Sequence, residues 1–330
     1  MIAILPCAAQ TGVPCLLAVP PAGFVRIPYD VTDVVVTALA LSCWLPYRRR
    51  AIRLARGGRA VAKWRQASFA AGLILLLIAL SSPVDAIADK VLVAHMAEHL
   101  LIGDLAPLLI VLGVTGPLIA PLLRNGVLAR ARVLAHPLVA LPVWAVDLYA
   151  WHSPLLYDAA LRNDYLHVLQ HTCFLFCGAA MWMALLGPLP KPAWFGNLGR
   201  LGYIIVVRLI EAVLGNIFLW SHSTLYPYYK AFEPHYGISP LQDQIDAGAV
   251  MMIEGSIVTL LCFASLFMRA ASQSEERQQL LDYARAHNLD LDDARAARAV
   301  AAGRGEELLR RLEERTVVDK KPPAGTATTR

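Results

Sequence analysis

Apolar residues in this chain fall into long blocks and do not follow the spacing of an amphipathic helix or strand. Each block has about 17–25 residues, and a helix of about 20 residues crosses a hydrocarbon core about 30 Å thick. Only a helix satisfies its own backbone hydrogen bonds in lipid, so the predicted fold class is all-α, a polytopic membrane protein with about seven spans. The predicted spans are residues 31–47, 67–83, 91–113, 133–151, 165–186, 202–221 and 247–268.

Segments of different character flank this predicted transmembrane domain of residues 31–268. Residues 1–30 begin with an apolar stretch that Pro6, Pro14, Pro20 and Pro21 interrupt, and they lack the basic region that begins a secretory signal. They are interpreted as an outer N-terminal arm, in which Cys7 and Cys15 are either paired or free. Residues 269–330 are rich in charge and are expected to form a cytosolic tail that is partly helical and then disordered.

Basic residues alternate between connections and thereby predict the orientation. A net charge of +5 raises the possibility of an acidic partner such as nucleic acid, but the distribution of charge argues for lipid instead. The second, fourth and sixth connections carry one basic residue each, Lys90, Arg162 and Lys230 respectively. By the positive-inside rule, the N-terminus is outside, the C-terminus is inside, and the number of spans is odd. The basic residues of the first, third and fifth connections are Arg48, Arg49, Arg50, Arg53, Arg56, Arg59, Lys63, Arg65, Arg124, Arg130, Arg132, Lys191 and Arg200.

Two histidine pairs with four-residue spacing lie at the predicted outer surface. His95 and His99 begin the third span, and His167 and His171 begin the fifth. Residues four apart share one face of a helix, so each pair presents two imidazoles side by side. Glu98, three residues after His95, is expected on that same side.

Further polar residues at the same depth extend this set. His152 and His222 lie at the predicted outer ends of the fourth and sixth spans. Ionisable groups are costly in a bilayer unless paired, so we predict a metal or haem site near the outer surface. Asp243 and Asp246, at the start of the seventh span, are expected to contribute to it, with Glu254 on the same stripe.

Four polar residues lie deeper in the predicted spans. Arg208 and Glu211 are three residues apart and are expected to neutralise one another on a face that also carries His222. Asp147 lies in the fourth span. Asp104 follows the first histidine pair but is expected to point to the opposite face of its helix.

The residues alone leave several kinds of site open. Imidazole suits zinc, copper and iron, and Met96, between the first two histidines, favours copper slightly. The sequence HMAEH also fits H-x-x-E-H, in which two histidines hold zinc and Glu98 would activate water for an intramembrane protease. Histidines on facing helices could instead ligate haem. A transporter of copper or protons is the remaining alternative, and it requires polar groups through the whole membrane.

Three segments carry a resemblance to a known family. HMAEHLLIGDLAPLLIVLG resembles the H-M-x-x-H-L-L…A-P-L-L-V-L-G signature of CtaG-type cytochrome c oxidase assembly proteins. WHSPLLYDAALRNDYLHVLQHTCFLFCGAAMW and SPLQDQIDAGAVMM resemble two later motifs of that family, in the same order. Met252 and Glu98 depart from the family pattern and take no role from it. The residues that match are His95, His99, His152, His167, His171, Asp243 and Gln244.

The resemblance implies a seven-span protein of the bacterial inner membrane that assists maturation of haem-copper oxidases. Its expected partners are cytochrome c oxidase subunits and membrane lipid. The expected cofactor is copper, handled at the outer face by ligand exchange, so we do not expect an enzyme. Haem and zinc stay open as alternatives.

Overall fold

The computed structural model describes residues 31–81, 83–124, 130–232 and 236–319, and over these ranges the chain is helical without strands. The prediction of an all-α fold is confirmed. The predicted arm at residues 1–30, with Cys7 and Cys15, and the end of the tail lie outside the described residues. The helices of the bundle are α1 (Val31–Arg56), α2 (Lys63–Ser81), α3 (Pro83–Ala88), α4 (Leu92–Leu100), the π-helix η1 (Leu101–Leu105), α5 (Ala106–Gly113), α6 (Gly116–Ile119), η2 (Leu122–Arg124), η3 (Ala131–Ala135), α8 (Pro137–Trp151), α9 (Pro154–Leu161), α10 (Asp164–Leu185), α11 (Asn197–Trp220), η4 (Pro227–Ala231) and α13 (Pro240–Ala286).

Among the described residues, five helical segments are long and apolar enough to cross a membrane: α2, the continuous rod α4–η1–α5, α10, α11 and α13. The predicted spans at 31–47 and 133–151 lie in α1 and in η3–α8. Helix α8 has 15 residues, which corresponds to about 22 Å and is short for a full crossing. The chain is therefore a membrane protein, while the number seven and the orientation stay predictions.

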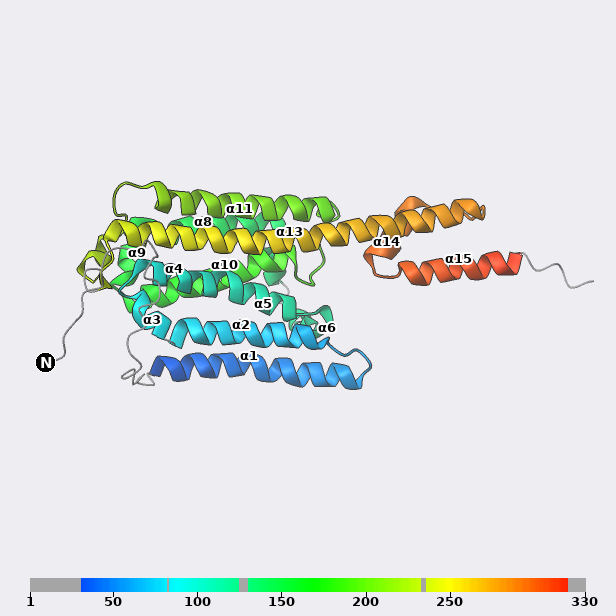
Figure 1. Cartoon of the computed structure of the whole chain (residues 1–330). Coiled ribbons are helices and arrows are strands. Elements are labelled where there is room, and N and C mark those ends of the chain that lie inside the picture. The colour runs from blue at the N-terminus through cyan, green and yellow to red at the C-terminus, as the bar shows by residue number, and fades with distance from the viewer. Residues whose placement is uncertain (1–30, 82, 125–129, 233–235, 320–330) are drawn as a thin grey trace, which may run out of the picture.

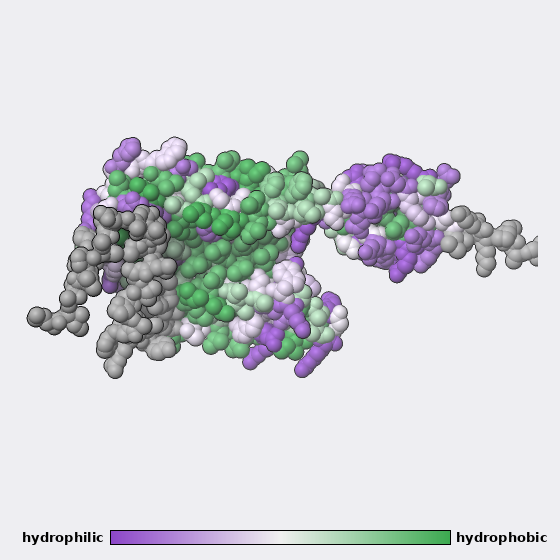
Figure 2. Space-filling model, viewed as in Figure 1, coloured by the Kyte–Doolittle hydropathy of each residue, from purple (hydrophilic) through white to green (hydrophobic). Residues whose placement is uncertain are grey.

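The long helices lie side by side with nearly parallel axes (Figure 1). The rod α4–η1–α5 packs against α2, α10 and α13, and α11 packs along α13. Hydrophobic residues cover the side of this bundle, with hydrophilic residues gathered at its ends and over the tail (Figure 2). Leucines such as Leu39 and Leu260 are exposed, as expected for residues that face lipid.

Two glycines allow the rod and α10 to approach very closely. A methyl group built on Gly178 of α10 would lie 1.9 Å from the carbonyl oxygen of Gly103 in η1. Only residues without a side chain permit such an approach, which is a common device of membrane helices. The crossing lies between the histidine-bearing ends of the two helices and the deeper core around Trp182.

Helix α13 continues well beyond the apolar block that predicted the last span. It has 47 residues, a length of about 70 Å, and it runs unbroken through residue 268. The tail predicted from 269 onward therefore begins inside a helix. Helices α14 (Asp293–Ala301) and α15 (Gly305–Asp319) fold back on this extension around a separate small core of Leu280, Ala296 and Leu308.

Candidate metal centre

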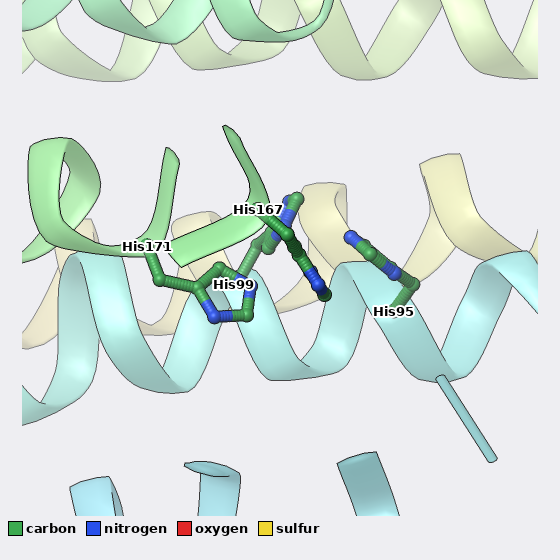
Figure 3. A group of neighbouring side chains, drawn as sticks. All are labelled: His95, His99, His167 and His171. Atoms are coloured by element: carbon green, nitrogen blue, oxygen red, sulfur yellow. The ribbon is translucent and has the colours of Figure 1, made fainter. Parts of the chain in front are cut away.

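The two histidine pairs predicted from spacing face one another across the contact between α4 and α10 (Figure 3). One nitrogen from each of His95, His99, His167 and His171 lies within 4.8 Å of the others. The ring centroids of His95 and His167 are 5.3 Å apart, and those of His99 and His171 are 5.4 Å apart. Ligands about 2.0–2.1 Å from one ion would lie somewhat closer together, so small rotations of these rings suffice to bind it. We call these four residues the histidine group.

Burial and hydrogen bonding of the histidine group fit a bound cation. His95 is fully buried and His99 is 6% exposed. Both ring nitrogens of His99, and Nε2 of His167 and of His171, are buried without a hydrogen-bond partner among the described residues. A buried imidazole nitrogen without a partner is costly, and coordination to an ion would satisfy it.

Glu98 brings a carboxylate to the edge of this group. Its side chain is fully buried, and its Oε1 lies 4.0 Å from Nε2 of His171. The prediction that Glu98 lies on the histidine side of its helix is confirmed. A negative charge at this point would offset part of the charge of a cation held by the imidazoles.

Three tyrosines cover the histidine group at the end of the bundle. The Tyr157 ring of α9 lies 5.3 Å from that of His95, and its hydroxyl group is 3.1 Å from the hydroxyl of Tyr229 in η4. The ring of Tyr226 stacks on Tyr157 at 3.9 Å. Burial raises the pKa of Tyr229 well above its usual value, so this phenol stays neutral. The sequence offered a signal only for Tyr157, which lies in the WHSPLLYDAAL motif.

His152 lies beside the histidine group but is not part of it. Its ring centroid is 5.8 Å from that of His99. Its Nδ1 lies 2.7 Å from the Leu148 carbonyl oxygen. A proton on Nδ1 would be donated to this oxygen, which leaves the lone pair on Nε2. Tyr226 donates a hydrogen bond to the His152 backbone carbonyl, which ties this turn to the tyrosine cover.

Asp243 stabilises the helix that carries the first histidine pair. Its two carboxylate oxygens accept hydrogen bonds from the backbone N–H groups of Leu92 and Val93, at 2.7 and 2.9 Å. These N–H groups begin α4 and have no partner within the helix. Neighbouring Gln244 accepts from Leu225 N–H and donates to Phe218 O, so it fastens the loop after α11. From α13, Asp243 therefore fixes the start of the helix that carries His95 and His99, and Gln244 fixes the loop that leads to η4.

The structure does not bring His222 and Asp246 to the histidine group. His222 was predicted to share a helical face with Glu211. It is exposed and lies beyond the end of α11 at Trp220, so this prediction is wrong. Asp246 accepts a hydrogen bond from Gln242 on its own helix. The sequence indicated only the depth of these residues in the membrane, and depth does not determine the direction of a side chain.

A π-helical turn places Asp104 on the side that was not predicted. In η1 the N–H of Ala106 bonds to the carbonyl of Leu101, five residues back. Residues five apart therefore lie on nearly the same side, so Asp104 follows His99 and does not point away from it. It is buried, accepts a 2.6 Å hydrogen bond from Trp182 Nε1, and lines a cavity that His99 also lines.

Arg208 and Glu211 do not form the predicted ion pair. No ion pair joins them within the described residues, and Arg208 donates to the Met252 carbonyl oxygen at 3.1 Å and to Ser256 Oγ at 2.8 Å. Both side chains lie over Gly255 of α13, whose missing Cβ leaves them room. Glu211 and Glu254 line the same cavity as Asp104.

Comparison with known proteins supports the resemblance described above. The sequence profile of a family described as cytochrome c oxidase caa3 assembly factor matches residues 44–273. Uncharacterized proteins of Mycobacterium bovis and Mycobacterium tuberculosis are each 24% identical over 275 residues, covering 76% of this chain and 42% of theirs. One from Mycobacterium leprae is 22% identical over 263 residues, covering 73% of this chain and 39% of its own. The chain thus spans about two fifths of the curated relatives it matches, and no solved structure matches it.

Proposed function

Because this chain belongs to the cytochrome c oxidase caa3 assembly factor family, we propose that it binds copper at the histidine group and delivers it to an oxidase subunit. The observation that carries the proposal is the convergence of four imidazoles from two helices, within 4.8 Å and largely buried. The expected partners are oxidase subunits at the outer face of a bacterial inner membrane. The expected activity is ligand exchange, without covalent chemistry.

Ligand chemistry favours copper among the metals that imidazole binds. Zinc and iron also accept imidazole, but copper in its reduced state additionally accepts thioether sulfur. Met96 and Met251 are buried next to the histidine group and line the adjoining cavity. A copper ion that leaves the imidazoles would therefore meet soft ligands close by.

The tyrosine cover suits transfer to a partner protein. Tyr157 of α9 meets Tyr229 of η4 through their hydroxyl groups and stacks on Tyr226, so a few aromatic contacts hold the two segments together. Separation of these two segments would expose the histidine group at the end of the bundle, where a partner subunit can dock. A protein that opens only on docking releases little metal to water.

Haem and protease functions have less support. A macrocycle between the two histidine pairs would need separated helices, whereas α10 and the rod approach to backbone contact at Gly178 and Gly103. A zinc protease would need an open ligand position and access for a peptide, whereas Glu98 and His95 are fully buried. A single ion as cargo fits this site best.

Replacing one histidine pair tests the proposal. We expect the His95→Ala and His99→Ala double variant to lower copper in the detergent-purified protein, measured by elemental analysis, and to lower copper content and activity of the oxidase in cells. His222→Ala is the matched control, because His222 is exposed and lies away from the group. Normal oxidase copper in the double variant, with the protein inserted at normal levels, would contradict the proposal. A Soret band in the purified protein would favour haem instead.

A further inference from the structure

A cavity extends from the histidine group toward the middle of the bundle, between the rod, α8, α11 and α13. It leaves about 60 Å³ for the centres of water molecules, which is room for several of them. His99 lines it at one end. The acidic residues that line it are Asp104, Asp147, Glu211 and Glu254. We call it the acidic cavity.

Acidic side chains outnumber basic ones around this cavity. None of the described residues that line it is a lysine or arginine, and Arg208 alone acts on Glu211 and Glu254 from nearby. The carboxyl groups of Asp104 and Glu254 lie within reach of a mutual hydrogen bond, which requires a proton on one of them. A bound cation between the two groups would take the place of that proton. Several carboxylates beside one guanidinium are costly inside a membrane unless protons or bound cations neutralise them.

Unsatisfied polar atoms point to a ligand in the same space. His99 is more than nine-tenths buried, and neither of its ring nitrogens has a hydrogen-bond partner among the described residues. Glu254 Oε1 and Asp147 Oδ2 are buried and likewise have no hydrogen-bond partner there. The π-turn at η1 is what directs Asp104 into this space, and such turns are frequent at functional sites.

We propose that the acidic cavity is a second metal site, which holds a partly hydrated metal cation on its way to or from the histidine group. The inference rests on the proposed function, because the cation is the same cargo. His99 belongs to both sites, so an ion can move between them by exchange of carboxylate for imidazole ligands. The compact set of four nitrogens is the tighter site, and the carboxylates with water form the weaker one.

Metal stoichiometry separates this inference from the proposed function. We expect the full-length protein in detergent to bind two copper ions when equilibrated with Cu(I) or with Cu(II), the second more weakly, as measured by elemental analysis after equilibrium dialysis. The Asp104→Asn and Glu254→Gln double variant keeps the shape of both side chains but removes their charge. It should bind one ion, with the affinity of the histidine group unchanged within about threefold.

Asp246→Asn is the matched control, because Asp246 lies on the same helix as Glu254, hydrogen-bonds to Gln242, and is not among the described residues that line the cavity. It should still bind two ions. One ion in the unaltered protein, or two in the double variant, would overturn the second site and leave the proposed function standing. No bound copper in the unaltered protein would overturn the proposed function itself.

Discussion

Asp243 holds the start of α4 although it lies outside the histidine group. Loss of a helix cap costs about 1 kcal/mol, and each buried N–H left without a partner costs about 1–3 kcal/mol. We therefore expect Asp243→Ala to reduce the free energy of unfolding by about 2–4 kcal/mol, seen as a lower midpoint in thermal unfolding of the purified protein. Copper affinity should fall about tenfold or more, as for other supporting residues around metal ligands, because His95 lies one turn after the capped N–H groups.

Asp246→Ala is the control for this prediction, since it removes a carboxylate three residues away that supports no other helix. It should leave stability within about 0.5 kcal/mol and copper affinity unchanged. Equal effects of the two substitutions would mean that Asp243 acts through general charge and not as a cap.

Single residues also show where prediction from the sequence ends. The four-residue spacing of the histidine pairs sufficed to place two imidazoles on one helix face, because that face follows from helix geometry. The same geometry failed for Asp104, since a π-turn has no clear signature in the sequence. Asp243 was expected to contribute to the metal site, whereas its role as a cap on another helix depends on which helices are neighbours.

At the scale of helices, Gly178 decides how closely the two histidine pairs approach. A methyl group there would lie 1.9 Å from the Gly103 carbonyl oxygen, well inside the contact distance, so the helices would have to separate. We expect Gly178→Ala to destabilise the protein by about 1–3 kcal/mol or more and to lower copper binding sharply. Thermal unfolding and elemental analysis of the purified protein measure both effects.

Gly202→Ala provides the comparison in α11, because a methyl group there meets no atom within 4 Å. Alanine favours a helix over glycine by up to about 1 kcal/mol, so this variant should be as stable as the parent or more so. Normal copper binding in Gly178→Ala would show that the crossing does not set the geometry of the site.

The helices themselves were largely predictable, whereas their contacts were not. In the described part of the chain, each predicted apolar block coincides with one or more helices apart from a residue or so at their ends, because a bilayer permits little else for such a sequence. The meeting of α4 with α10 depends on the glycine contact, which becomes apparent only when the helices are packed. The continuation of α13 past residue 268 was missed because hydropathy marks the end of an apolar block and not the end of a helix.

For the whole molecule, the side of the membrane that holds the histidine group decides which partners can reach it. The strongly basic connection between α1 and α2 lies at the same end of the bundle as the tail (Figure 1), and the positive-inside rule predicts that this end faces the cytosol. We expect a cysteine introduced at exposed Ser223, in the loop near the tyrosine cover, to react in intact cells with a maleimide that cannot cross membranes. A cysteine introduced at exposed Gly196, in the connection that precedes α11, should react only after the cells are opened. The unaltered chain gives the background reaction of the native cysteines. The reverse pattern would place the histidine group on the cytosolic side, so a delivery role at the outer face would be wrong even if copper binds.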